Sequence, residues 1–100
     1  MTKIALVTGA GTGVGKAAAH ALMAGGYHVI FNGRRENVLQ DALNKGGSEF
    51  GGAGEVIAGD ISDAAFVESL FAQIEERHGR IDVLFNNAGI IVHSLSLIHI

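Results

Sequence analysis

The chain has 100 residues, of which 48% are hydrophobic, 17% are charged and 15 are glycine. This composition indicates one globular domain, and the absence of cysteine excludes disulfides and thiolate metal sites. The net charge of -3 provides no basic surface, so we expect neither a nucleic-acid partner nor electrostatic attachment to a membrane. The sequence shows no signal-peptide pattern and no apolar run of membrane-spanning length, so we expect a cytoplasmic protein.

Strand and helix patterns alternate along the chain. Short apolar runs predict strands at residues 3–7, 27–31, 55–58 and 81–85. Apolar residues three or four apart predict helices at 14–24, 35–45 and 63–78. Ser62 or Asp63 can cap the third helix and Gly79 follows its end, whereas Gly46 is expected to end the second helix and to begin a loop at 46–54.

The expected buried face of each helix follows from this periodicity. For the first helix it comprises Val14, Ala17, Ala18, Ala21 and Leu22. For the second it comprises Val38, Leu39, Ala42 and Leu43, and for the third Phe66, Val67, Leu70, Phe71 and Ile74. Four strands joined by three crossover helices predict an α/β protein with a doubly wound parallel sheet and helices on both faces.

The stretch of residues 8–15 contains four glycines between the first strand and the first helix. Glycines let the backbone turn sharply and approach a ligand, and the free N–H groups and dipole of a helix N-terminus favour an anion. The stretch therefore predicts a cradle for a phosphate group. The alternative is a tight turn that only allows the helix to pack on the sheet.

Two well-known glycine motifs do not fit this stretch. A P-loop would need glycine in place of Ala10 and a hydroxyl in place of Ala17. The strict dinucleotide fingerprint G-x-G-x-x-G fails because Val14 or Lys16 occupies its last glycine position.

The pattern that fits is Thr8-Gly9-x-x-x-Gly13-x-Gly15, and it resembles the glycine motif of the short-chain dehydrogenase/reductase family. Three further matches follow in order: Gly33-Arg34-Arg35, Asp60, and Asn86-Asn87-Ala88-Gly89. Each lies at the carboxyl end of a predicted strand, the edge where open α/β sheets bind ligands. The resemblance covers residues 3 to about 93. It implies that residues 1–94 are the N-terminal NAD(P)-binding half of a Rossmann-like domain, truncated after about four strands.

The resemblance also implies which residues hold a cofactor. The glycine turn would hold the pyrophosphate, Asp60 the adenine amino group and Ile61 the adenine ring, with Thr8 fixing the turn by hydrogen bonding. Asn87, Ala88 and Gly89 would lie nearest the cofactor, while Asn86 is as well explained by a structural role. The full candidate set is Gly9, Gly11, Thr12, Gly13, Val14, Gly15, Arg34, Arg35, Asp60, Ile61, Asn87, Ala88 and Gly89.

The end of the second predicted strand favours NADP over NAD as the cofactor, although NAD is possible. An acid at this position accepts the ribose hydroxyls of NAD, whereas a cation pairs with the 2′-phosphate of NADP. Here Gly33 occupies the position of the acid, and Arg34 and Arg35 follow. The same feature disfavours a methyltransferase of similar fold. The alternative is that the arginines only begin a solvated helix, where their charge opposes the helix dipole.

Other polar residues have simpler explanations. Asp60 can instead cap a helix, and Lys16 is a solvated side chain or a secondary phosphate contact. His20, His28 and His78 have no metal-ligand partner at a useful spacing in the sequence, so we expect structural roles for them and no metal site.

No catalytic residue can be assigned. The family uses a tyrosine with a lysine four residues later, a serine and an asparagine. Here Tyr27 is the single tyrosine and is followed by Phe31, while Ser94 and Ser96 come too soon after the fourth predicted strand. The resemblance implies a parent enzyme that transfers hydride between carbonyl and alcohol forms of a small-molecule substrate, as a homo-oligomer.

The 100 residues themselves are expected to be inactive, and a non-catalytic dinucleotide-binding module is the alternative. A parallel sheet cut after its fourth strand exposes an apolar edge, which predicts aggregation. Residues 95–100, Leu-Ser-Leu-Ile-His-Ile, can be encoded by CTG TCT CTT ATA CAC ATC, which looks like a sequencing-library adapter. We expect this tail to be non-native; the alternative is a natural tail that adds a strand.

Overall fold

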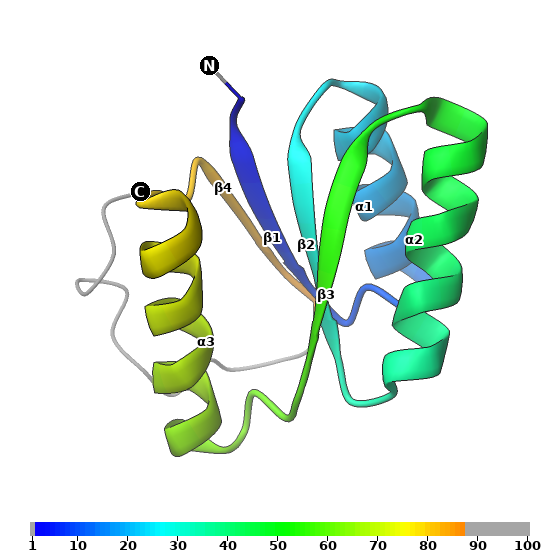
Figure 1. The fold of residues 1–100 in the computed structure, drawn as a ribbon. Coiled ribbons are helices and arrows are strands. Elements are labelled where there is room, and N and C mark those ends of the chain that lie inside the picture. The colour runs from blue at the N-terminus through cyan, green and yellow to red at the C-terminus, as the bar shows by residue number, and fades with distance from the viewer. Residues whose placement is uncertain (1, 88–100) are drawn as a thin grey trace.

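The computed structural model describes residues 2–87. Its strands are β1 (Ile4–Thr8), β2 (His28–Gly33), β3 (Ala53–Ala58) and β4 (Val83–Asn86). Its helices are α1 (Gly13–Ala24), α2 (Glu36–Phe50) and α3 (Ala64–His78), and they alternate with the strands along the chain (Figure 1). The predicted order of four strands and three helices is confirmed. No helix in the described part is long and apolar enough to cross a membrane.

The four strands form one parallel sheet in the order β3-β2-β1-β4. The chain moves outward from β1 through β2 to β3 and then returns to place β4 on the other side of β1. At the carboxyl ends, Thr8 is paired with Asn32 of β2 and with Asn86 of β4. Open α/β sheets bind ligands where the strand order reverses in this way, so this edge of β1 is the expected site.

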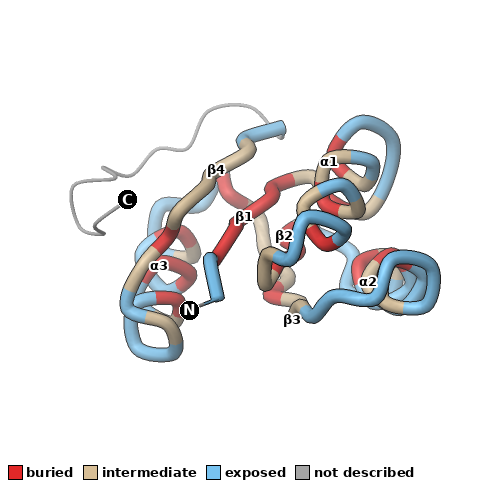
Figure 2. The backbone as a smooth tube through the Cα atoms, turned by 90° about the horizontal axis from the view of Figure 1, so that it is seen from above, coloured by how far each residue is buried: buried red, intermediate tan, exposed pale blue. Residues whose placement is uncertain are grey.

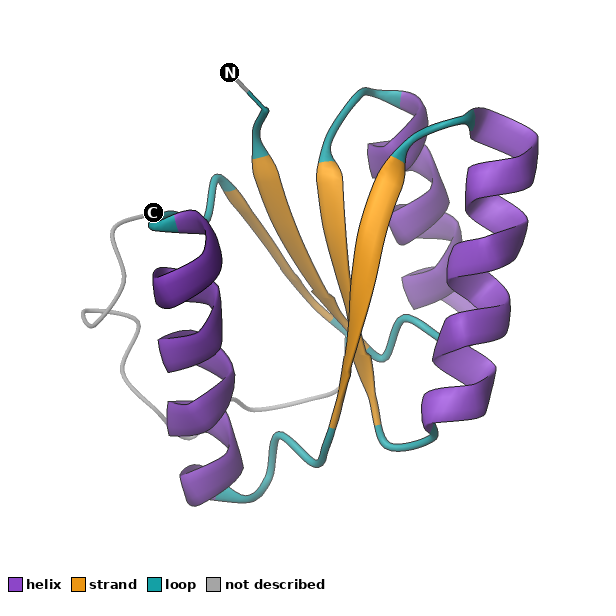
Figure 3. Cartoon of the chain, viewed as in Figure 1, coloured by secondary structure: helices purple, strands orange, loops and turns teal. Residues whose placement is uncertain are grey.

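Helices cover both faces of the sheet, as predicted. Figures 2 and 3 show α1 and α2 on one side and α3 on the other. Leu6 and Ile30 pack with α3, whereas Val7 and Phe31 pack with α1 and α2, and all four side chains are fully buried. Each such side chain contributes about 1.5–3 kcal/mol of burial free energy. Burial on both faces explains why the central strands β1 and β2 read as continuous apolar runs.

The predicted apolar face of α1 is wrong for Val14, Ala17 and Ala21, which are exposed, whereas Leu22 is partly buried against the core as predicted. The buried residues of this helix are Gly15, Ala19 and Met23, and Val14 is 66% exposed. The physical reason is close approach, because a Cβ atom on Gly15 would lie 1.9 Å from the carbonyl oxygen of Gly9. Small residues therefore face the sheet in the first turns of α1 and Met23 does so near its end, so the face that contacts the sheet is turned away from Val14.

The predicted loop at 46–54 is also wrong for most of its length. Helix α2 continues to Phe50, and β3 begins at Ala53. Gly46 is buried inside the helix, where a Cβ atom would lie 2.7 Å from both His20 Cδ2 and Met23 Sδ of α1. Gly46 is thus selected by the contact between two helices, and the helix ends five residues later at Gly51, whose φ is 77°.

Helix α3 matches the prediction closely. Asp63 is its N-cap, and its carboxylate accepts a hydrogen bond of 3.0 Å from the amide of Ala65. Gly79 ends the helix in a left-handed conformation. The buried residues are Val67, Leu70, Phe71 and Ile74, four of the five predicted, and Phe66 is partly buried against the same cluster.

Candidate functional site

The glycine turn joins the buried end of β1 to the first residue of α1. Gly9 and Gly13 have φ values of 62° and 57°, in the left-handed region that side chains disfavour. Thr12 is the N-cap in an extended conformation, and its side chain makes no cap hydrogen bond. The first-turn amides of α1 thus receive no cap from Thr12, which leaves an N-terminus suited to an anion.

The other glycines of the turn serve packing. A Cβ atom on Gly15 would collide with the carbonyl of Gly9 and would lie 3.0 Å from Asn87 Nδ2. A Cβ atom on Gly11 would lie 2.8 Å from Cγ1 of Val38 in α2. The turn therefore holds the helix close to the sheet, as one of the two interpretations that the sequence left open requires, and the phosphate cradle stays a prediction.

Thr8 connects the ends of β1 and β4. Its hydroxyl donates to Asn86 Oδ1 at 2.9 Å and accepts from the backbone amide of Asn87 at 2.9 Å. These two bonds fix the point where the chain leaves β4, and the predicted role of Thr8 at the glycine turn stays a prediction. They also favour the structural role for Asn86.

Two adjacent clefts open at the carboxyl edge of the sheet. One has a volume of about 220 Å³ and is lined by Gly9, Gly11, Thr12, Gly33, Arg34, Arg35, Val38 and Leu39. The other has a volume of about 190 Å³ and is lined by Gly9, Asn32, Gly33, Arg34, Gly59, Asp60 and Ile61. Because the two share Gly9, Gly33 and Arg34, they bring together seven of the candidate residues from three separate loops.

The remaining candidates lie beside the clefts or beyond the described residues. Gly13 and Val14 are exposed in the first turn of α1, and Gly15 is buried beneath them. Asn87 is exposed after β4. Ala88 and Gly89 lie outside the described residues, as does the tail of 95–100.

Arg34 and Arg35 occupy the loop between β2 and α2, and both are exposed. The carbonyl of Arg35 accepts hydrogen bonds of 3.1 Å from the amides of Val38 and Leu39, so this residue does begin the helix. Within residues 2–87 neither guanidinium forms a salt bridge. The cleft between the glycine turn and α2 therefore carries two positive charges next to backbone N–H groups.

Asp60 lines the second cleft and lies in a short turn of its own. Its Oδ1 accepts from the amide of Ser62 at 2.9 Å and from the Ser62 hydroxyl at 2.8 Å. These two bonds, and secondarily the positive charge of Arg34, hold the pKa of Asp60 below its usual range. Since Asp63 is the N-cap of α3, the alternative role of Asp60 as the helix cap is wrong. Ile61 is buried beneath the cleft and belongs to the core on the α3 side.

Sequence reasoning missed Asn32, which organises the same edge. Its side chain is 1% exposed, and Nδ2 donates to the carbonyls of Ile57 at 2.9 Å and Gly59 at 3.4 Å. Its own carbonyl accepts from the amide of Ala10 at 3.0 Å. Asn32 thus connects the ends of β2 and β3 with the glycine turn. The predicted strand ended at Phe31, and Asn32 comes directly after it. An amide side chain at the end of an apolar run was the signal that could have found this residue.

The three histidines of the described part divide into two groups. His20 Nε2 forms a hydrogen bond of 2.8 Å with the carbonyl of Ala42, which joins α1 to α2 as a structural residue. His28 and His78, however, meet around Glu55. The sequence spacing gave no indication of this cluster, because its members come from β2, β3 and the end of α3.

The comparisons with known proteins agree with this architecture. The sequence matches the family described as short chain dehydrogenase over residues 3–99. It is 43% identical over 89 residues to a 3beta-hydroxysteroid dehydrogenase of Mediterraneibacter gnavus, with 89% of this chain and 32% of that protein covered. It is also 38% identical over 93 residues to the short-chain dehydrogenase/reductase homolog YusS of Bacillus subtilis, with 93% of this chain and 85% of that protein covered.

A solved structure shares the fold. The L-sorbose reductase of Gluconobacter frateurii, complexed with NADPH and L-sorbose, superposes with a TM-score of 0.82 at 28% identity, covering 89% of this chain and 34% of that one. The parallel sheet with helices on both faces and a glycine turn after β1 defines a Rossmann-like α/β protein. More specifically, the chain belongs to the short-chain dehydrogenase/reductase family. It spans about a third of the length of the hydroxysteroid dehydrogenase and most of the length of the YusS homolog.

Proposed function

We propose that this chain is the cofactor-binding part of an NADP-preferring oxidoreductase that transfers hydride between the carbonyl and alcohol forms of a small molecule. The proposal rests above all on the cleft that contains Arg34, because no carboxylate ends β2 and two guanidinium groups follow it, neither of which forms a salt bridge within residues 2–87. A guanidinium fork binds a phosphate through two hydrogen bonds. Several solved relatives are complexed with NADPH or NADP, which supports the same choice.

In this proposal the glycine turn holds the pyrophosphate at the N-terminus of α1. The exposed side chain of Val14 and the amides around Gly13 lie beside that position. Arg34 and Arg35 hold the 2′-phosphate, and Asp60 accepts the adenine amino group. Bound NADPH supplies the hydride, and the residues of this chain bind and orient its nucleotide part.

The chemical step itself is assigned to residues outside this chain. Tyr27, the single tyrosine, directly precedes β2 and lines a different hollow with Lys3, Gly25 and Gly26. This position is the amino edge of the parallel sheet, opposite the two clefts. Tyr27 is therefore not proposed as the acid/base, and the 100 residues alone are proposed to be inactive. We propose a homo-oligomer for the parent enzyme only.

A non-catalytic dinucleotide-binding module is the second candidate function. The observation that favours it is the YusS homolog, because this chain covers 85% of that protein. A relative of similar length therefore exists, which supports the proposal that a chain of this size acts without a catalytic half. The two candidate functions differ in whether the 100-residue chain binds a dinucleotide by itself.

The test of cofactor preference uses the full-length protein and the fluorescence of the reduced nicotinamide. We expect NADPH to bind more tightly than NADH, and Arg34→Leu to weaken NADPH binding about 10–100-fold, the loss of a charge-assisted hydrogen bond. NADH affinity should change little. Arg77→Leu is the matched control, because Arg77 contacts Glu55 and Gln73 and lines neither cleft, and it should leave both affinities unchanged. Equal affinity for the two cofactors in the unmodified protein would overturn the preference.

Measuring NADPH binding by the 100-residue chain distinguishes the enzyme fragment from the binding module. An aggregating chain without NADPH binding supports a broken enzyme, whereas tight binding without turnover supports the module. Reading the downstream gene for a serine followed by Tyr-x-x-x-Lys decides whether a catalytic half exists. Resequencing without the adapter tests residues 95–100: the same codons followed by a native stop would refute our hypothesis of a non-native tail.

A further inference from the structure

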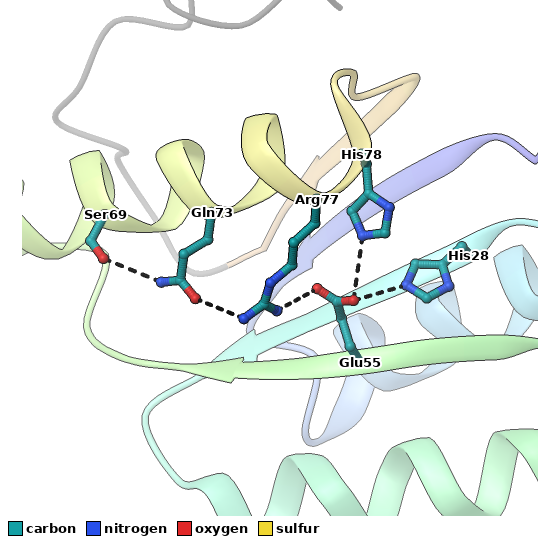
Figure 4. A network of polar contacts seen from close by, with 6 residues as sticks. All are labelled: His28, Glu55, Ser69, Gln73, Arg77 and His78. Carbon is teal, nitrogen blue, oxygen red and sulfur yellow. Dashed lines mark hydrogen bonds and ion pairs between the residues drawn. The ribbon is translucent and has the colours of Figure 1, made fainter.

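A cluster of three potential metal ligands lies on the α3 side of the sheet, away from the candidate cofactor clefts. His28 is the first residue of β2, Glu55 is in β3 and His78 is the last residue of α3. Figure 4 shows the three side chains pointing toward one another. Glu55 Oε2 lies 3.2 Å from His28 Nε2 and 3.3 Å from His78 Nε2, and the three ligand atoms all lie within 4.8 Å of one another.

We propose that His28, Glu55 and His78 bind a divalent transition-metal ion, for which Zn²⁺ is the reference. Zinc–ligand bonds of about 2.0–2.1 Å place neighbouring atoms of a tetrahedral site about 3.3 Å apart. Two of the three separations already have this value. The third, between the two imidazole nitrogens, is at most 4.8 Å, so metal binding would bring these two nitrogens closer together. Water can take the fourth position.

A chain of hydrogen bonds along α3 orients the carboxylate. Arg77 Nη1 donates to Glu55 Oε1 at 3.0 Å, and Arg77 Nη2 donates to Gln73 Oε1 at 3.3 Å. Gln73 in turn donates to the hydroxyl of Ser69 at 3.2 Å (Figure 4). Because Arg77 holds one oxygen of Glu55, the other oxygen faces the two histidines. Hydrogen bonds of this kind commonly orient metal-binding carboxylates.

The burial and chemistry of the cluster suit a transition metal. The side chains of His28, Glu55 and His78 are 19%, 23% and 18% exposed, so they are partly desolvated but reachable from solvent. Two imidazoles and one carboxylate favour zinc and its neighbours over Mg²⁺ or Ca²⁺, which prefer oxygen ligands alone. The positive charge of Arg77 opposes the ion, so we expect weaker binding than at a site without a nearby cation.

The ion would fasten separate elements of the fold. Glu55 and His28 belong to neighbouring strands, and His78 ends the helix that covers this face of the sheet. Metal binding to a folded site adds its free energy to folding. A role in stability, independent of the proposed dehydrogenase chemistry, follows from this position.

The test measures zinc uptake by the full-length protein in equilibrium dialysis. We expect the double variant His28→Gln/His78→Gln to bind one zinc fewer per chain than the unmodified protein. Each single variant, and Glu55→Gln, should weaken zinc binding at least as much as the loss of an outer hydrogen-bond partner, about 10–100-fold. His20→Gln is the matched control, because His20 is held by Ala42 outside the cluster, and it should bind zinc normally. Mg²⁺ should not compete.

A second measurement needs no variant. Diffraction at the zinc absorption edge from crystals of the unmodified protein should place an anomalous peak within bonding distance of both Nε2 atoms. Equal zinc uptake by the unmodified protein and the double variant would overturn the proposal. A peak elsewhere, no peak, or an equal loss of binding in His20→Gln would also overturn it.

Discussion

Single residues at the carboxyl edge of the sheet fix its geometry through close packing and through buried hydrogen bonds. Gly15 is required because α1 approaches the turn so closely that a Cβ atom would lie 1.9 Å from the carbonyl oxygen of Gly9. Thr8 and Asn32 place hydrogen-bonding groups in otherwise apolar surroundings, and both are almost fully buried. Their partners lie in other strands, in the residues just after them or in the glycine turn, so each of them sets the position of a neighbouring element.

Substituting Gly15 should destabilise the fold strongly. Gly15→Ala forces a methyl group against backbone atoms that cannot move freely, and we expect a loss of about 1–3 kcal/mol or more in the free energy of unfolding. Gly47→Ala is the matched control, since Gly47 is helical and its Cβ atom would meet only the carbonyl of Gly52, at 4.0 Å. It should gain about 0.4–1 kcal/mol. Urea unfolding measures both, and equal effects would contradict the close approach.

Substituting Thr8 tests the connection between β1 and β4. Thr8→Val keeps the shape of the side chain but leaves the amide of Asn87 without the hydroxyl acceptor, and we expect a loss of about 1–3 kcal/mol. Thr12→Val is the control, because Thr12 is exposed and makes no side-chain cap bond. Thermal unfolding of the two variants gives the comparison. If Thr12→Val lost as much stability as Thr8→Val, the valine side chain rather than the lost hydrogen bonds would cause the change, which would contradict this prediction.

At the scale of elements, the loop before β4 is fastened to the start of β1 by Asp82. Its Oδ2 accepts from the amide of Ile4 at 2.7 Å and from Arg80 Nε at 2.9 Å. The hydrogen bonds of Arg80, and then that of Ile4, hold the pKa of Asp82 below its usual range. A carboxyl group with a lowered pKa stabilises the fold when ionised, so its contribution should depend on pH.

The pH dependence has a definite sign. The stabilisation from Asp82 is complete above the pKa of an unfolded aspartate, about 3.9, and is lost as the pH falls through the lower folded value. We therefore expect Asp82→Asn to be less stable than the unmodified protein at pH 7. The difference should shrink in acid, as measured by urea unfolding between pH 7 and pH 2. A difference that is constant over this range would contradict the ionic contribution.

The type and order of the elements could be predicted from sequence, but two features could not. Short apolar runs identified the four strands, most clearly the buried strands β1 and β2. Apolar residues three or four apart identified the three helices. The buried face of α1 was largely missed, since Gly15 gives no hydrophobic signal and Ala19 cannot be told from the alanines at 17, 18 and 21. The end of α2 was missed because Gly46 resembles a stop signal but is selected by its contact with His20 and Met23.

At the scale of the whole molecule, strand order decides which distant residues share a site. Because all four strands are parallel, the loops after β1, β2 and β3 converge on one edge, and motifs read at strand ends could be predicted to meet there. The cluster of His28, Glu55 and His78 could not be predicted in this way. Its members lie at a strand start, inside a strand and at a helix end, so only the packing of α3 on the sheet brings them together.

The most direct test of the cofactor site is hydrogen–deuterium exchange of the full-length protein with and without NADPH. Binding should slow exchange in peptides that cover residues 9–15 and 33–36, and NADH should protect the second region less because it lacks the 2′-phosphate. Peptides around His28, at the other edge, should not change. Absence of protection at the glycine turn, or equal protection of residues 33–36 by both cofactors, would contradict our account.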